Sequence, residues 1–182
     1  MEVVKSQNSK ILKYILIVFA GSILLTISSK IKIPFYPVPM TMQTFVVLFL
    51  GMSFGYKIGF LTVSLYLIEG LLGLPVFSNS PEKGVGIIYF TGPTMGYLIG
   101  FLFATSLAGY FSFKENILIN FFKLLVSVSI IYIMGILWLG SLIGWDKPII
   151  QLGVAPFLLA ELLKISILAL LAKKIVRLKK II

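Results

Sequence analysis

The sequence predicts an all-α integral membrane protein, built as a bundle of six transmembrane helices. Hydrophobic residues make up 59% of the 182 residues, charged residues only 12%, and the mean hydropathy is +1.07. This composition lies outside the range of soluble globular proteins. Six apolar segments, separated by turn residues or charges, approach the length of about 20 residues that a membrane crossing needs. We expect one membrane domain over residues 1–182.

The six predicted spans lie at residues 11–29, 42–54, 58–74, 93–111, 117–143 and 154–175. The first is expected to be a retained span, because it is longer than the apolar region of a signal peptide and no A-x-A cleavage pattern follows. The second is short, so it should be tilted, partly re-entrant or screened by its neighbours. The third ends where Gly73 and Pro75 turn the chain.

The later spans carry different signals. The fourth has small residues at every fourth position, and such a stripe lets another helix pack closely where lipid supplies no hydrophobic drive. The fifth is long, and its Lys123 is close enough to the start to reach the interface. The sixth contains two charged residues. The stripe in the fourth span consists of Gly96, Gly100, Ala104 and Ala108.

The distribution of basic residues predicts the orientation, because cytoplasmic connections carry an excess of Lys and Arg. With both termini inside, eleven basic residues lie inside and four outside, and Lys164 is intramembrane. The basic residues gather at termini and short connections, which favours contact with lipid headgroups over nucleic acid. The inner set is Lys5, Lys10, Lys13, Lys57, Lys114, Lys123, Lys173, Lys174, Arg177, Lys179 and Lys180, and the outer set is Lys30, Lys32, Lys83 and Lys147.

A Pro-rich connection joins the first two spans on the predicted outer side. Prolines at 34, 37 and 39 remove backbone donors and favour an extended, polyproline-like chain, so this segment should be a stiff extracellular loop and not a helix. Thr41, Gln43 and Thr44 follow at the mouth of the second span, with hydroxyl and amide groups that suit a ligand. For Thr41, capping of the helix is an equally good interpretation.

The connection after the third span also falls on the outer side. We expect Phe77 and Asn79 in an ordered loop there, and Asn79 offers the donors and acceptor that a ligand amide or urea requires. A turn-forming Asn is the alternative. Tyr89 and Tyr97, further along, are either interfacial anchors or cavity walls.

Glu161 and Lys164, one helical turn apart, are the charges of the last span. Each charge at bilayer depth costs about 2.5–3.5 kcal/mol on insertion scales, so the pair should line a binding site instead of facing lipid. The alternatives are mutual neutralisation between packed helices, or a Lys164 side chain that reaches an interface. If the span begins near residue 154, Glu161 lies about 10 Å below that boundary.

The sequence contains no Cys and no His. This removes thiolate and imidazole chemistry, zinc sites and haem ligation, so we expect no catalytic residue, no metal and no cofactor. No phosphate-binding G-x-x-x-x-G-K-[ST] loop is present, so active transport would need another source of energy. An intramembrane enzyme using Glu161 as acid or base, and a purely structural subunit, are the competing interpretations from other classes.

Four segments in order and spacing resemble the BioY family: Val38-Pro-Met-Thr-Met-Gln-Thr44, Glu69-Gly-Leu-Leu-Gly-Leu-Pro-Val-Phe77, Gly92-Pro-Thr-Met-Gly-Tyr-Leu-Ile-Gly-Phe101 and Pro156-Phe-Leu-Leu-Ala-Glu-Leu-Leu-Lys164. The resemblance implies the biotin-binding S component of an energy-coupling factor transporter. It further implies a six-helix bundle in the bacterial plasma membrane that binds biotin near its extracellular side. Two cytoplasmic ATPases and a transmembrane coupling subunit would drive transport. An S component for another carboxylated vitamin is the nearest alternative.

The resemblance also assigns residues. Asn79 matches a polar ligand contact, and Glu161 and Lys164 match the acidic and basic pair of the last helix, although the family usually has Asp where this chain has Glu161. Met95 stands where Gly is common. Gln43, Thr41, Phe77, Tyr89 and Tyr97 complete the expected ligand-binding set, and the small residues expected to dock the coupling subunit are Ala20, Gly21, Ser22 and Thr26.

Overall fold

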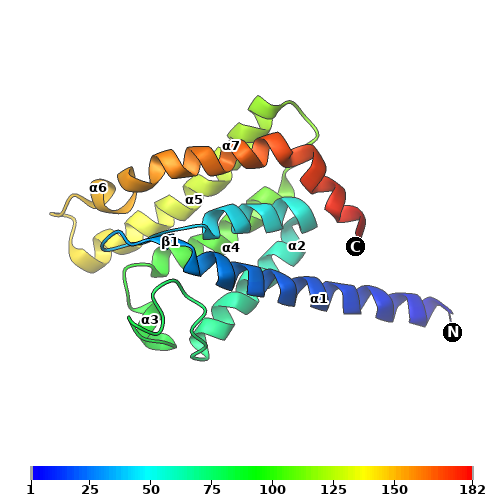
Figure 1. Cartoon of the computed structure of the whole chain (residues 1–182), viewed down its shortest axis with the longest axis horizontal. Helices are drawn as coiled ribbons and strands as arrows, with labels where there is room; N and C mark the ends of the chain where they lie inside the picture. Colours follow the sequence, from blue (N-terminus) through cyan, green and yellow to red (C-terminus); the bar gives the residue numbers. More distant parts are fainter. Residues whose placement is uncertain (1, 182) are drawn as a thin grey trace.

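The computed structural model describes the backbone of residues 2–181 and the side chains of residues 10–180, and the described chain is predominantly helical. Most of the chain lies in long helices, and short helical turns and a two-stranded antiparallel ladder occur in the connections (Figure 1). The helices are α1 (Glu2–Lys30), α2 (Gln43–Leu71), α3 (Ile87–Phe90), α4 (Met95–Tyr110), α5 (Ile117–Ile143), α6 (Ile149–Gly153) and α7 (Leu158–Ile175), with 3₁₀ turns η1 (Ala155–Phe157) and η2 (Val176–Ile181) and strands β1 (Lys32–Ile33) and β2 (Met40–Thr41).

Helix α2 consists of two arms, 43–54 and 56–71, that meet at Gly55. This residue has φ 83° and ψ 174°, a backbone region that is essentially restricted to glycine, so the chain reverses here without strain. The two arms are the second and third predicted spans. With α1, α4, α5 and α7 they form the predicted six-helix bundle within residues 2–181.

Length and composition support membrane crossing. Within residues 2–181, four helical segments are long and apolar enough to span a bilayer: Lys10–Lys30, Gln43–Leu71, Ile117–Ile143 and Ile149–Lys180. The shorter α4 is also apolar. In the first arm of α2 no residue is exposed, because neighbouring helices surround it. This confirms that the short second span is screened.

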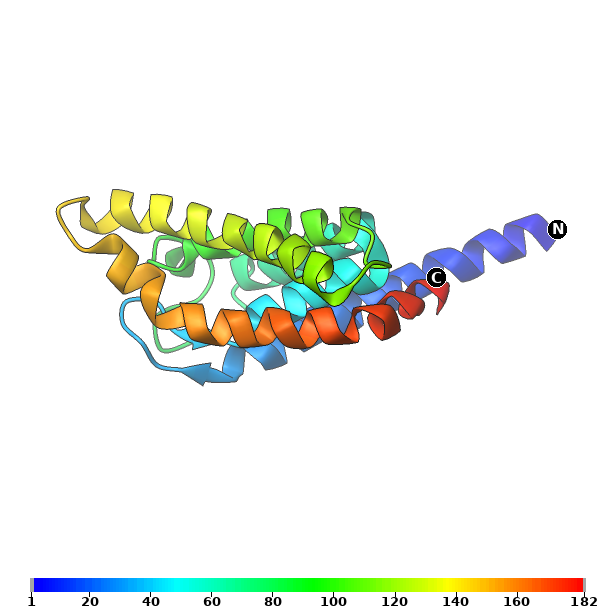
Figure 2. The same cartoon turned by 90° about the horizontal axis from the view of Figure 1, so that it is seen from above.

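The connections alternate between the two ends of the bundle (Figures 1 and 2). The segments 31–42, 72–94 and 144–157 lie at one end, which we call the loop end. The Gly55 reversal, the 111–116 connection and the two chain termini lie towards the other, which we call the terminal end. The predicted outer basic residues therefore lie at the loop end and the predicted inner ones towards the terminal end. Lys5 is left out of this comparison, because its side chain is not among the side chains that the structure describes.

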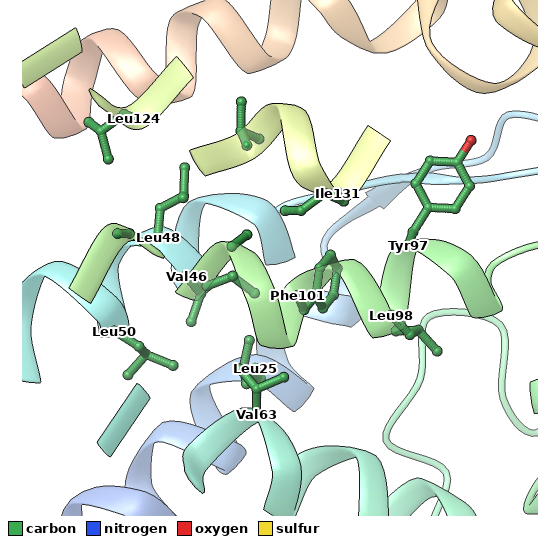
Figure 3. Close-up of a cluster of buried hydrophobic side chains, with 14 of the residues drawn as sticks. Leu25, Val46, Leu48, Leu50, Val63, Tyr97, Leu98, Phe101, Leu124 and Ile131 are labelled. Carbon is green, nitrogen blue, oxygen red and sulfur yellow. The ribbon is translucent and has the colours of Figure 1, made fainter. Parts of the chain in front are cut away.

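The core lies between α1, α2, α4, α5 and α7 (Figure 3). Leu25, Val63, Leu48 and Phe101 are buried there. The small-residue stripe of α4 packs as predicted, since a Cβ at Gly96 would lie 2.4 Å from the Met134 carbonyl oxygen on α5.

Two helices have other bounds than the predicted spans. Helix α1 runs nine residues further towards the N-terminus than the predicted start at residue 11, because polar residues flanking an apolar span can continue the same helix. The last predicted span, 154–175, is not one continuous α-helix: the chain first forms α6 and the 3₁₀ turn η1, where Pro156 lacks a backbone donor, and α7 begins at Leu158.

Candidate ligand-binding site

A cavity at the loop end collects residues from seven parts of the chain. Its empty volume is about 540 Å³, a figure that includes the space at its open side. Most of the wall is apolar or aromatic. The lining residues are Val38, Pro39, Met40, Thr41, Gln43, Thr44, Ser78, Tyr89, Thr94, Tyr97, Leu98, Phe101, Ile131, Tyr132, Phe157 and Glu161.

Lys164 lies behind Glu161 and does not line this cavity. Its ammonium donates to Glu161 Oε1 at 2.7 Å, to the Thr41 carbonyl oxygen at 2.7 Å and to Thr44 Oγ1 at 3.0 Å. A lysine ammonium has three donors, and all three are used here. Lys164 therefore holds Glu161 and the start of α2 in place, and has no donor left for a ligand.

Glu161 presents one free acceptor to the cavity. Its Oε1 accepts from Lys164 and from Thr44 Oγ1 at 2.7 Å, whereas its Oε2 is buried and accepts no hydrogen bond from the described residues. The residue is only 5% exposed. Because an unpaired buried polar atom is costly, Oε2 is open to a donor, either the neighbouring Tyr132 hydroxyl, which interacts with this carboxylate, or a molecule in the cavity.

Glu161 lies close to the start of its helix. Since α7 begins at Leu158, Glu161 lies in the first turn, about 5 Å from the helix start at 1.5 Å per residue. The free backbone N–H groups of a helix start favour negative charge nearby. The carboxylate is therefore stabilised both by Lys164 and by the helix that carries it.

Aromatic side chains form the walls around this acceptor. Tyr132 packs edge-to-face with Tyr97, at 6.1 Å between ring centroids, and lies 6.2 Å from Phe157. Tyr97 donates its hydroxyl to the Gly153 carbonyl oxygen at 2.9 Å, which ties α4 to α6. Burial raises the pKa of Tyr89 above its ordinary value. Flat apolar walls of this kind suit a rigid ring system.

Asn79 is held apart from the main cavity. Its Oδ1 accepts from Lys32 Nζ at 3.0 Å, and it lines a separate small hollow beside Lys83. Lys32 also donates to the Ser78 carbonyl oxygen at 2.6 Å, and Lys30 donates to the carbonyls of Phe77 and Ser80 at 2.7 and 2.9 Å. Two lysines thus fix the loop that carries the cavity-lining Ser78.

The other predicted ligand residues divide into two groups. Thr41, Gln43, Tyr89 and Tyr97 line the cavity. The Gln43 amide is partly engaged, because Nε2 donates to the Tyr66 hydroxyl at 2.8 Å. Phe77 does not line the cavity; it is buried and stacks on Tyr89 at 4.6 Å, so it supports the wall from behind.

The four predicted docking residues on α1 face different ways. Ala20 is exposed and Thr26 is half-buried, but Gly21 and Ser22 are buried against α2. A Cβ at Gly21 would lie 2.5 Å from the Thr62 methyl group, and Ser22 donates to the Glu69 carboxylate. Only Ala20 and Thr26 of this set are available to a partner outside the chain.

Sequence reasoning missed several residues of the cavity: Ser78, Thr94, Tyr132 and Phe157. Ser78 has a buried hydroxyl without a hydrogen-bond partner among the described residues, so it is a second polar group open to a ligand. The neighbouring Asn79 was the local signal for this loop. Tyr132 lies inside an uninterrupted apolar span, where nothing in the pattern distinguishes a cavity wall from a packing residue.

Comparison with known proteins identifies relatives of the whole chain. The family model described as the BioY family matches residues 3–180. The chain is 36% identical over 152 residues to a "Probable biotin transporter BioY" of Pyrococcus horikoshii, covering 84% of this chain and 89% of that protein. It is 35% identical over 158 residues to the "Biotin transporter BioY" of Thermotoga maritima, covering 87% and 90%.

A solved structure shares the fold. The crystal structure of the S-component for biotin from an ECF-type ABC transporter aligns with a TM-score of 0.76, at 24% identity, and covers 92% of each chain. The family match over nearly the whole chain, relatives above 30% identity and the common six-helix fold lead to one conclusion: the protein belongs to the BioY family.

Proposed function

We propose that this protein captures biotin from outside the cell as the substrate-binding S component of an energy-coupling factor importer. One observation carries the proposal. Glu161 Oε2 is a buried acceptor without a partner, placed in an aromatic-lined cavity of about 540 Å³. Such a site selects a compact ring that donates N–H groups. The ureido head of biotin supplies two such donors, on an apolar bicyclic body.

The charges of the cavity also orient the ligand. Its lining contains one carboxylate, Glu161, and no lysine or arginine. The ligand carboxylate would be repelled by Glu161, so the ureido head lies against Oε2 and the tail points towards the open side. Ser78 and Gln43 are polar residues of the same lining that can complete the contacts of the ring.

Matched ligands test the proposal. Calorimetry on the purified chain should show binding of biotin and of biotinamide, which keeps the ureido head. Lipoate has the same carboxylated tail and a sulfur ring but no N–H donors, and should not compete. If lipoate or another carboxylated vitamin binds more strongly than biotin, that compound is the ligand instead of biotin. The assignment as an S component would not be affected.

We infer that the cavity is a binding site and not the active site of an enzyme. The Glu161 carboxylate is committed to Lys164 and Thr44 through Oε1, and no nucleophile, metal or cofactor enters the proposal. The BioY family, to which the chain belongs, contains biotin transporters. We therefore assign no catalytic residue. A structural subunit would have no reason to keep an unpaired carboxylate oxygen in a cavity.

We propose further that both termini are cytoplasmic and that the loop end faces outwards in the plasma membrane, since the loop end carries the smaller share of basic residues. The absence of native Cys makes accessibility labelling simple. Lys147→Cys should react with a membrane-impermeant maleimide in intact cells, whereas Lys180→Cys should react only after permeabilisation. The opposite pattern would reverse the orientation.

Binding and transport should be separable. Alone in liposomes, the chain should bind radiolabelled biotin without concentrating it, because ligand binding shifts an equilibrium only by its differential affinity and cannot sustain cycling against a gradient. Uptake should appear when a coupling subunit and two ATPases are added, with ATP on their side of the membrane. Ala20→Trp, on the exposed face of α1, should then reduce uptake while biotin affinity is unchanged. Concentration of biotin by the chain alone, without an ion gradient, would contradict the proposal.

A further inference from the structure

A second hollow lies at the terminal end of the bundle, opposite the ligand cavity. It forms where the 111–116 connection meets the C-terminal part of α7 and the η2 turn (Figure 2). Its empty volume is about 590 Å³, including open space. The lining residues are Phe113, Lys114, Lys173, Val176, Arg177 and Lys180.

Four of these six lining residues are basic, and none is acidic. Lys173, Arg177 and Lys180 follow at intervals of four and three residues, so they share one face of the helical tail. Among the described side chains, no ion pair is formed by any of the four. The carboxylate nearest in sequence, Glu115, is bonded to Lys123. The hollow therefore concentrates positive charge that no described acidic side chain neutralises.

The floor of the hollow is apolar. Phe113 is 1% exposed and Val176 is half-buried. Apolar side chains continue from the hollow along the helices that border it, since Leu170 on α7 and Leu118 on α5 are 63% and 64% exposed. A cationic hollow that opens onto an apolar helix surface matches a molecule with an anionic head and hydrocarbon chains.

We propose that this hollow is a binding site for the phosphate-bearing headgroup of an anionic phospholipid, whose acyl chains lie along α5 and α7. Arg177 supplies a planar fork of donors that matches two phosphate oxygens, and the lysines add point charges around it. The site places the headgroup in the leaflet on the side of the chain termini. A soluble phosphate compound would leave the apolar surface beside the hollow uncovered, so the lipid is the better occupant.

Native mass spectrometry of the full chain, titrated with phosphatidylglycerol or phosphatidylcholine, tests this site. The wild type should retain one phosphatidylglycerol at concentrations where phosphatidylcholine is lost. Lys173→Gln/Arg177→Gln should weaken retention of phosphatidylglycerol by about tenfold or more, as expected for two basic groups at a headgroup. The control, Lys174→Gln/Lys179→Gln, removes two charges from the same tail outside the hollow and should have little effect. Unchanged biotin binding in both variants shows that they fold.

Three outcomes would overturn the proposal. Equal weakening by the two double variants would mean that the tail attracts anions diffusely. Equal retention of the two lipids would mean that the headgroup is not recognised. Displacement of the lipid by glycerol phosphate at the same concentration would identify a site for small phosphate compounds instead.

Discussion

Glu161→Gln is expected to weaken biotin binding about 30- to 100-fold, which is roughly 2–3 kcal/mol for hydrogen bonds to a charged group. The glutamine carbonyl can still accept from Lys164 and Thr44, whose donors now reach Oε1 at 2.7 Å. The other position, however, becomes an NH₂ group that faces the N–H donors of the ligand. Calorimetry with biotin measures the loss. Affinity within about threefold of wild type would remove Glu161 from the ligand contacts.

Variants of the Glu161–Lys164 ion pair separate its effect on stability from its effect on biotin binding. Lys164→Met leaves Glu161 buried without its cation, and breaking a buried pair in this way costs about 3–5 kcal/mol. The double variant Glu161→Gln/Lys164→Met has no unpaired charge and should recover much of that stability, measured by thermal unfolding in detergent. Its biotin affinity should stay low. Recovery of both stability and affinity would show that the ion pair has only a structural role.

Gly51→Leu is expected to destabilise the bundle by about 3 kcal/mol or more, at the upper end of overpacking effects. Even the first atom of a side chain here, the Cβ, would lie 2.3 Å from the Thr105 carbonyl oxygen and 3.0 Å from the Gly109 nitrogen. Both neighbours are backbone atoms, which cannot move aside without separating α2 from α4. The melting temperature should fall, and biotin affinity with it, because the same arm of α2 positions Thr44.

Gly92→Ala is the comparison for this substitution. A Cβ at Gly92 would meet only the Tyr89 carbonyl oxygen, at 3.1 Å, and the residue lies outside the helices. The expected change in melting temperature is small. If Gly51→Leu unfolds at the temperature of wild type, the close approach of α2 and α4 is not required for stability.

Much of the fold follows from local signals. The helix at 117–143 has the bounds of the fifth predicted span; in the structure Asn116 caps its start and Gly144, with φ 93°, ends it. The break near Gly55 was visible as an interruption between two apolar runs. The start of α7 was not visible, because residues 149–157 are as apolar as the helix that follows and hide the turn at η1.

The site was predictable in position but not in contacts. The convergence of the Pro-rich connection, the loop after the third span and the start of the last span follows from alternating crossings, and the structure brings all three to the loop end. Which residues face the cavity did not follow. Asn79 is turned towards Lys32, and Lys164 lies behind Glu161, although all three were predicted as ligand-binding residues.

The number of spans, the separation of the two sets of basic residues and the position of Glu161 and Lys164 one helical turn apart follow from the sequence alone, since these depend on hydropathy, local charge and the three-residue spacing. The ion pair between the two side chains, which the sequence left as an alternative to lining a site, is seen only in the fold. Tertiary structure decided which oxygen of Glu161 is free. That choice depends on Thr41 and Thr44, which reach Lys164 from more than 100 positions away in the chain. Whether a buried polar group has a hydrogen-bond partner depends on every neighbour that packs against it, and only the folded bundle brings those neighbours together.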